Sequence, residues 1–130
     1  MYLLDTNTLI YFFKGKGRVG DHLLALPPHS VAIPAITLFE LETGLRKSAG
    51  PEKRRQQLSA FTNLVAVLPF AAREAEAAAM VRAALEQRGQ PIGPYDVLIA
   101  GTALAHNATL VTHNRAEFAR IEGLQLVDWY

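Results

Sequence analysis

The chain has 130 residues, of which 50% are hydrophobic and 19% are charged, a composition typical of one globular domain over residues 1–130. It contains no cysteine, which excludes disulfides, thiolate metal sites and cysteine nucleophiles. No stretch has the pattern of a secretion signal or a membrane span, so we expect a cytoplasmic protein without a membrane partner.

The net charge of +1 is unevenly distributed along the chain. Residues 1–65 carry eight lysines and arginines against five acids, whereas residues 66–130 carry five arginines against seven acids. The basic excess in the first half is consistent with a basic rim that faces an anionic partner. Solvated helix faces are the alternative explanation of such clusters.

Short apolar runs alternate with segments of helical periodicity along the whole chain. The predicted strands cover residues 2–4, 31–33, 65–68, 109–111 and 124–127. The predicted helices begin after Thr6-Asn7 and then cover residues 19–26, 36–45, 52–64, 71–88, 95–106 and 116–120. This alternation predicts an α/β fold with a mainly parallel central sheet and helices on both faces.

The first candidate site residue is Asp5, which directly follows the apolar run Tyr2-Leu3-Leu4. Such a run suits a strand that is buried on both faces. Asp5 is therefore expected at the carboxyl end of a central strand, where open α/β sheets bind their ligands. The alternative is that Asp5 or Thr6 only caps the helix that follows.

The second candidate is Glu40, in the predicted helix 36–45. The apolar residues Leu38, Leu41 and Leu45 share the packed face of this helix, and the helical neighbours of Glu40 are mostly small. Glu42 lies about 200° around the helix from Glu40, because each residue advances by about 100°. Only one of the two acids can face Asp5, and the small neighbours favour Glu40. An exposed surface glutamate is the alternative for either.

The third candidate is Asp96, near the start of a helix that is apolar almost all the way round and is therefore expected to be buried. A carboxylate at a buried helix end needs partners, and a metal ion is one of the few adequate ones. The alternative is an ordinary helix cap, stabilised by the helix dipole and the free amides.

A polar turn, Thr112-His113-Asn114, follows the predicted strand 109–111 and is expected at the same edge of the sheet as Asp5. Glu117 comes three residues after Asn114, in the first turn of a short helix. An ordinary helix start capped by Asn114 is the alternative. Together, three acids and a polar turn at one edge favour a functional site over three independent caps.

Clustered carboxylates repel one another unless cations balance them. Oxygen ligands suit Mg²⁺ or Mn²⁺, which bind through a few carboxylates together with water and substrate phosphate. The chemistry indicated is phosphodiester hydrolysis without a covalent intermediate. An aspartyl-phosphate phosphatase is disfavoured because position 7 is asparagine, and a receiver domain because no lysine follows Lys53.

In these motifs the sequence resembles the PIN-domain ribonucleases, specifically the VapC-type toxins of bacterial toxin–antitoxin pairs. The resemblance runs from residue 2 to residue 129 in the family's order and spacing. It is carried by Leu4-Asp5-Thr6-Asn7, Ile36-Thr37 with Glu40-Leu41 and Gly44, Ile92-Gly93-Pro94-Tyr95-Asp96 with Ile99-Ala100, Leu110 to Asn114 with Glu117-Phe118, and Gly123-Leu124 with Asp128-Trp129.

The resemblance implies a PIN-like domain in which Asp5, Glu40 and Asp96 are ligands of Mg²⁺ or Mn²⁺. The fourth acid of the family often falls where this chain has Asn114, and Glu117 is the candidate replacement, which leaves a second metal open. We assign supporting roles to Thr6, Asn7, Thr112 and Asn114.

The resemblance also implies a homodimer and a cognate VapB-type antitoxin that covers the active site in a hetero-oligomer. The late Thr-x-Asn-x-x-Glu-Phe pattern is similar to a branch that cuts a tRNA anticodon loop, which would inhibit translation. Candidate contacts to RNA phosphates are Lys14, Lys16 and Arg46. The alternatives are a DNA-cutting PIN-like nuclease and a catalytically silent PIN-like binding module.

Overall fold

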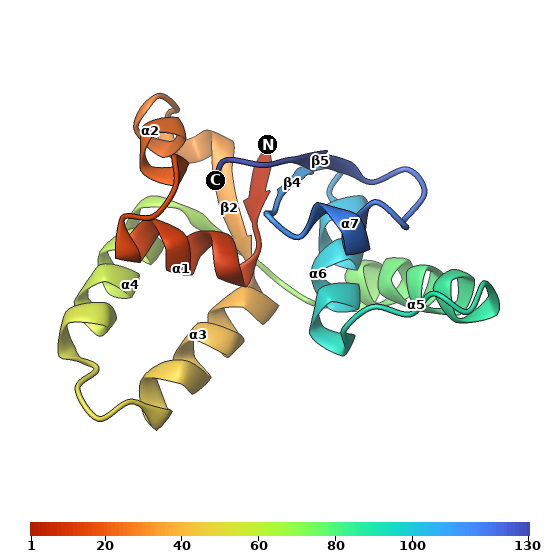
Figure 1. The fold of residues 1–130 in the computed structure, drawn as a ribbon, viewed down its shortest axis with the longest axis horizontal. Helices are drawn as coiled ribbons and strands as arrows, with labels where there is room; N and C mark the ends of the chain where they lie inside the picture. Colours follow the sequence, from red (N-terminus) through yellow and green to blue (C-terminus); the bar gives the residue numbers. More distant parts are fainter.

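Five short parallel strands form the central sheet of the protein, which a computed structural model describes for residues 1–130 (Figure 1). The sheet has the order β3-β2-β1-β4-β5, and every neighbouring pair is parallel. The strand β1 therefore lies in the centre, with Leu3 paired to Ala32 on one side and to Leu110 on the other. The strands are β1 Tyr2–Leu4, β2 Val31–Pro34, β3 Ala66–Leu68, β4 Thr109–Val111 and β5 Gln125–Val127.

Helices connect all of these strands, as the sequence predicts. They are α1 Thr6–Lys14, α2 Val19–Leu24, α3 Ala35–Lys47, α4 Glu52–Leu64, α5 Ala72–Gln87, α6 Pro94–Ala105 and α7 Arg115–Phe118. The predicted bounds agree with the structure to within two residues. A short 3₁₀ helix, Pro28–Ser30, was not predicted. The α2 helix ends at Leu24, two residues before the expected end at Leu26. Leu26 directly precedes Pro27, and the proline ring disfavours helical dihedrals at the residue before it.

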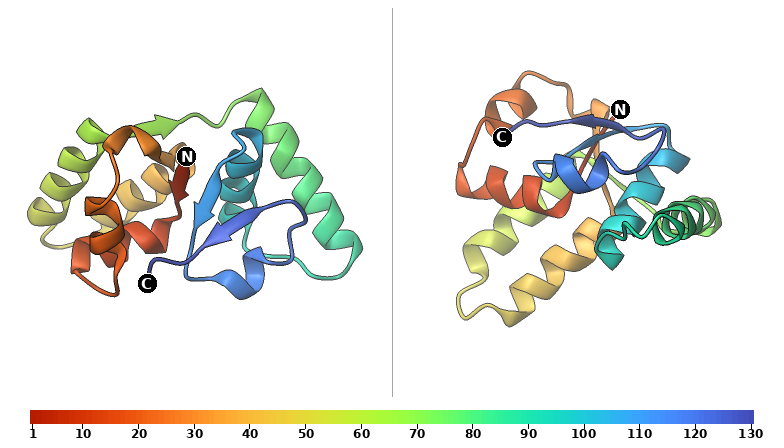
Figure 2. Two further views of the ribbon diagram at one scale, coloured as in Figure 1. Left: turned by 90° about the horizontal axis from the view of Figure 1, so that it is seen from above. Right: turned by 45° about the vertical axis from the view of Figure 1, so that its right-hand side comes forward.

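The two faces of the sheet bury two separate hydrophobic clusters. Leu3, Ala32 and Leu110 point to one face and pack with residues of α5, α6 and α7, whereas alternate strand residues such as Leu4 and Val111 point to the other face. That second face is covered by residues of α1, α3 and α4. Figure 2 shows the sheet between these two groups of helices. The predicted α/β fold with helices on both faces is confirmed.

The helices α5 and α6 pack very closely because one of them carries a glycine at the contact. A side chain at Gly101 would place its Cβ only 2.6 Å from backbone and side-chain atoms of Ala78. Only glycine fits there without a shift of one helix. This packing sets the position of α6, and hence of Asp96 at its start. None of the helices combines the length and hydrophobicity that crossing a membrane requires.

The parallel arrangement brings the carboxyl ends of all five strands to one edge of the sheet. Asp5 follows β1, α3 follows β2, and Thr112 follows β4. In Figure 1 the starts of α1, α3 and α6 converge below the carboxyl ends of β1 and β2. The polar residues singled out in the sequence therefore gather at this edge.

Candidate active site

Asp5 is the most buried of the candidate acids, with 4% of its surface exposed. It is the N-cap of α1, where its Oδ1 accepts a 2.9 Å hydrogen bond from the backbone N–H of Thr8. Burial raises the pKa of Asp5, while hydrogen bonds from Thr112 and Thr8 partly offset that rise. Asp5 thus caps α1 and also lies at the carboxyl end of the central strand, as the sequence predicts. Its role in a functional site stays a prediction.

Glu40 is held by Thr6, and a second threonine, Thr37, anchors the same helix to the sheet. The hydroxyl of Thr6 donates a 2.6 Å hydrogen bond to Glu40 Oε1 and lies 3.5 Å from the hydroxyl of Thr37. Thr37 is fully buried and donates to the carbonyl oxygen of Leu4, one residue before Asp5. Thr6 therefore ties the Glu40 carboxylate to the start of α1, and Thr37 separately ties α3 to the end of β1.

Glu42 has a different environment from Glu40. It forms a 3.5 Å ion pair with Arg55 of α4. The structure places Glu40, and not Glu42, on the side of Asp5, as its small neighbours in the sequence indicated. The role of Glu40 as a metal ligand stays a prediction.

Asp96 lies in the first turn of α6 but does not cap it. The N-cap residue is Gly93, with Pro94 at the first helical position, and no side chain caps this end. Burial, followed by the negative charges of Asp5, Glu40 and Glu117, raises the pKa of Asp96 to about 6. The helix-cap alternative for Asp96 is therefore wrong, and its carboxylate belongs to an acidic cluster.

Asn114 occupies the N-cap position of α7 without capping it through its side chain. Its amide group instead donates a 3.0 Å hydrogen bond to Glu117 Oε2. The backbone N–H of Asn114 donates to the hydroxyl of the fully buried Thr112, which also hydrogen bonds to Asp5. This turn thereby links Glu117 to Asp5. Asn7 lies in the first turn of α1, and its side chain is exposed.

The four carboxylates of Asp5, Glu40, Asp96 and Glu117 are close enough to act on one another electrostatically, since three of them raise the pKa of the fourth. They are not gathered around one point, however, and no three acidic or histidine side chains have the spacing of a metal-ligand group. Mutual repulsion of like charges favours such separation. All the side chains that meet here offer oxygen, the donor that Mg²⁺ and Mn²⁺ prefer.

Comparison with known proteins agrees with this geometry. The family model of the PIN domain matches residues 2–124. The chain is similar to the tRNA(fMet)-specific endonuclease VapC of Salmonella typhimurium, at 37% identity over 98% of this chain and 97% of the relative. It is similar to Ribonuclease VapC2 of Rickettsia felis, at 38% identity over 99% of this chain and 98% of the relative.

The solved structure of VapBC2 from Rickettsia felis, bound to a DNA fragment from its promoter, contains a chain with the same fold. It has a TM-score of 0.92 and 37% identity, and the match covers 99% of this chain and 98% of that chain. The chain belongs to the PIN-domain family, among the VapC ribonucleases. The resemblance recognised in the sequence is confirmed, and the enzyme class is that of an RNA-cleaving hydrolase.

Two features of this VapC-type site were not identified from the sequence. Asp128 follows β5 at the same edge, and its charge adds to the rise in the pKa of Asp5. Its position directly after the last strand was the signal that could have found it. Phe39 and Tyr95, the chain neighbours of Glu40 and Asp96, contact each other edge to face with 5.5 Å between ring centroids. This contact connects the two helices that carry the acids.

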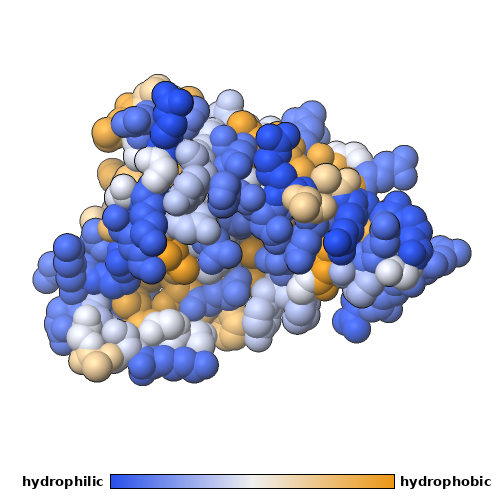
Figure 3. All heavy atoms as spheres, in the orientation of Figure 1, coloured by the Kyte–Doolittle hydropathy of each residue, from blue (hydrophilic) through white to orange (hydrophobic).

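The predicted RNA-contact residues Lys14, Lys16 and Arg46 are exposed, and none of them forms an ion pair. Lys14 ends α1, Lys16 lies in the following turn, and Arg46 lies in the last turn of α3. Hydrophilic residues predominate on the face shown in Figure 3, with apolar residues visible between them. All three cations are thus unpaired at the surface, and their contact with RNA stays a prediction.

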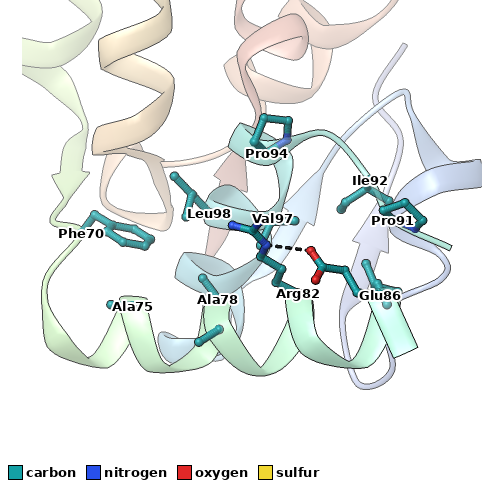
Figure 4. Close-up of a pocket in the computed structure, with 12 residues that line it drawn as sticks. Phe70, Ala75, Ala78, Arg82, Glu86, Pro91, Ile92, Pro94, Val97 and Leu98 are labelled. Atoms are coloured by element: carbon teal, nitrogen blue, oxygen red, sulfur yellow. Dashed lines mark hydrogen bonds and ion pairs between the residues drawn. The ribbon is translucent and has the colours of Figure 1, made fainter. Parts of the chain in front are cut away.

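A cavity of about 460 Å³ between α5 and α6 is separate from this acidic cluster. Figure 4 shows it lined mainly by apolar side chains, with the Arg82–Glu86 ion pair along the wall that α5 forms. Its only acid is therefore already neutralised by an arginine. The candidate active site is the open acidic edge and not this cavity.

Proposed function

We propose that this VapC-type protein is the metal-dependent endoribonuclease toxin of a toxin–antitoxin pair, with Asp5, Glu40 and Asp96 as its central acids and Glu117 as the fourth. The observation that supports this proposal best is the pKa of Asp96, which burial and the charges of Asp5, Glu40 and Glu117 raise to about 6. A cluster of that kind holds more negative charge than the protein itself balances, and a divalent cation compensates it.

The chemistry of the four acids and of Thr6, Thr112 and Asn114 suits Mg²⁺ or Mn²⁺, because each of these side chains offers a carboxylate, hydroxyl or amide oxygen. When bound, such an ion supplies positive charge to the phosphate in the transition state and lowers the pKa of a nearby water. We assign its binding to Asp5, Glu40 and Asp96, and the completion of the site to Glu117. Asn114 contributes no charge and acts by holding Glu117 Oε2.

The protein residues act mainly by orientation. Thr8 and Thr112 fix the carboxylate of Asp5, and Thr6 fixes Oε1 of Glu40, which leaves Oε2 of Glu40 for the site. Fixed acids of this kind align a water for in-line attack at phosphorus, which breaks the bond to the leaving oxygen without a covalent enzyme intermediate.

The proposed substrate is a structured RNA with unpaired nucleotides, probed best with tRNA. The supporting observation is the name of relatives from Salmonella typhimurium and Shigella flexneri, which are tRNA(fMet)-specific endonucleases at 37% and 35% identity. The Thr112-x-Asn114-x-x-Glu117-Phe118 pattern led to the same substrate class, a tRNA anticodon loop. Cleavage there would inhibit translation.

The proposed partners are a VapB-type antitoxin and a second copy of this chain. The supporting observation is that chains with TM-scores of 0.92 come from VapBC complexes of Rickettsia felis and Salmonella typhimurium. The proposed location is the cytoplasm, where the substrate RNA is found.

The test combines cut-site mapping with metal removal. Total bacterial RNA is treated with purified protein, and the new 5′ ends are mapped in Mg²⁺, in Mn²⁺ and in EDTA. We expect discrete cuts in unpaired loops that disappear in EDTA and return when Mg²⁺ is restored, and that are missing for Asp5→Asn. Unchanged cleavage in EDTA would reject the metal mechanism. Cleavage of DNA but not RNA would support the DNA-cutting alternative, and binding without cleavage would support the silent binding module.

A further inference from the structure

Three aromatic side chains form a cluster beside the acidic edge, and the proposed mechanism does not use them. The rings of His113 and Tyr130 stack with 4.2 Å between centroids and an interplanar angle of 23°. Tyr11 of α1 contacts both of them edge to face, with its ring centroid 4.8 Å from that of Tyr130 and 5.9 Å from that of His113. We call these three residues the aromatic cluster.

The aromatic cluster is held in place although two of its members are exposed. Asp128 Oδ2 lies 2.9 Å from Nδ1 of His113, and Asp128 Oδ1 accepts a 2.9 Å hydrogen bond from the backbone N–H of Tyr130. The turn at Gly17, where φ is +64°, lies so close that a Cβ there would be 2.9 Å from the Tyr130 ring. The side chain of His113 is nevertheless 46% exposed, and Tyr130 is 44% exposed. The rings are therefore ordered before any partner arrives.

The aromatic cluster adjoins the acids through the turn after β4. His113 lies between Thr112, which hydrogen bonds to Asp5, and Asn114, which hydrogen bonds to Glu117. From the other side, Asp128 contacts His113 and lies near enough to Asp5 for its charge to act there. A group that is stacked on these rings is consequently next to a phosphate held at the acidic edge.

The charges around the aromatic cluster also suit a nucleotide. The backbone N–H of Lys16 donates to the carbonyl oxygen of Tyr11, which places this exposed cation in the adjoining turn. The carboxylate of Asp128 is engaged by His113 and the N–H of Tyr130, and the charge of Arg115 also acts on it. Exposed rings flanked by cations are the combination that binds unpaired bases together with their phosphates.

We propose that the exposed faces of His113 and Tyr130 stack an unpaired base of the substrate next to the scissile phosphodiester. This inference rests on the proposed function, and it adds a part of the enzyme that selects a flexible, unstacked nucleotide over a base-paired one. Stacking is tolerant of base identity, because every base has a flat face. The aromatic cluster therefore selects for single-stranded RNA at the cut site without reading its sequence.

The test uses an RNA hairpin that the protein cleaves in its loop. It is compared with a series of hairpins in which one loop nucleotide at a time lacks its base. For the unaltered protein, we expect one abasic position beside the cut to lower kcat/KM about tenfold, the loss of one base–aromatic stack. His113→Ala and Tyr130→Ala should lower kcat/KM for the intact hairpin about tenfold, and the abasic position should then cost nothing further. His113→Phe, which keeps a flat ring, should retain the abasic penalty.

The matched control is His22→Ala, which removes another exposed imidazole, stacked on Trp129 at 5.3 Å. We expect the control to cleave both hairpins like the unaltered protein. Equal losses on intact and abasic hairpins in His113→Ala and Tyr130→Ala would overturn the proposal, since the cluster would then only support the fold of the turn. Normal RNA cleavage with weakened inhibition by a VapB-type antitoxin would also overturn it, and would assign the surface to a protein.

Binding measured in an Asp5→Asn background separates this proposal from the proposed function. With cleavage prevented, the dissociation constants of the intact and abasic hairpins should differ about tenfold, and the difference should vanish in His113→Ala. If no metal-dependent cleavage existed, this binding difference would still report stacking. If cleavage existed without the binding difference, the stacking proposal alone would fail.

Discussion

The hydroxyl of Thr6 donates a 2.6 Å hydrogen bond to Oε1 of Glu40, although the two residues are 34 positions apart in the chain. This bond connects the first turn of α1 to the second turn of α3 across the end of β1. Oε1 of Glu40 is therefore hydrogen-bonded to the protein, which leaves Oε2 for the site. Glu42 on the same helix pairs with Arg55 instead.

Glu40→Gln and Glu42→Gln should therefore have opposite outcomes. We expect Glu40→Gln to lower the rate of RNA cleavage on the order of 100-fold, because it removes one charge from the proposed metal site. Glu42→Gln should cleave at nearly the unaltered rate, since it breaks only a surface ion pair. Initial rates in Mg²⁺ with matched circular dichroism spectra check this. Equal losses in both variants would reject the placement of Glu40 in the site.

Asp96→Asn should stabilise the fold while it abolishes cleavage. The pKa of Asp96 is raised from 3.8 to about 6, so the folded protein holds this proton more tightly than the unfolded chain does. Stability should therefore decrease as the pH rises from about 4 to about 6. With allowance for solvent screening at this partly exposed group, Asp96→Asn should raise the free energy of unfolding at pH 7 by about 1–2 kcal/mol.

Urea unfolding at several pH values in EDTA measures this effect, with the exposed Asp21→Asn as the control. The difference between Asp96→Asn and the unaltered protein should shrink as the pH falls from about 6 to about 4 and vanish at lower pH, where Asp96 is protonated in both states. A variant that is equally stable or less stable at pH 7 would contradict the electrostatic cluster. Addition of Mg²⁺ should raise the melting temperature of the unaltered protein more than that of Asp96→Asn.

Glu117 and Asn114 test the fourth position of the site. Three carboxylates suffice for one divalent ion, so we expect one metal in the free enzyme and a second, if any, only with RNA bound. Glu117→Gln should reduce cleavage less than Asp5→Asn does, and it should raise the Mn²⁺ concentration needed for half the maximal rate. Asn114→Asp should lower that concentration because it adds a negative charge. If Glu117→Gln responded to Mn²⁺ like the unaltered protein, Glu117 would not belong to the site, which would then contain only three acids.

Lys14, Lys16 and Arg46 should contribute to RNA affinity by releasing counterions from phosphates. Replacing any one of them with alanine should weaken binding of a single-stranded RNA at low salt and reduce the slope of log K against log salt by about 0.7. Arg82→Ala is the control, since Arg82 is paired with Glu86 at the cavity between α5 and α6. Equal affinities at low and high salt in the unaltered protein would rule out the basic rim.

The sequence determined the helices and strands to within two residues, because their signals are local. Apolar runs mark the strands, periodic apolar residues mark the helices, and prolines and glycines mark the ends. It also determined that Asp5 and the turn after β4 lie at one edge, since parallel strands share the direction of their carboxyl ends. Helical geometry showed that only one of Glu40 and Glu42 can face Asp5, and the small neighbours of Glu40 favoured it. The roles of these acids as metal ligands stay predictions.

The tertiary structure decided which of these groups touch. The strand order places β1 between β2 and β4, so Asp5 lies between the elements that carry Glu40 and Thr112. The bond from Thr6 to Glu40 and the stack of His113 on Tyr130 depend on that order and on how α1 and α3 pack against the sheet. The spacing of residues along the chain does not predict such contacts. The strand order is selected by burial of both hydrophobic faces of the sheet. Side chains that are distant in sequence become neighbours only once the strands have this order.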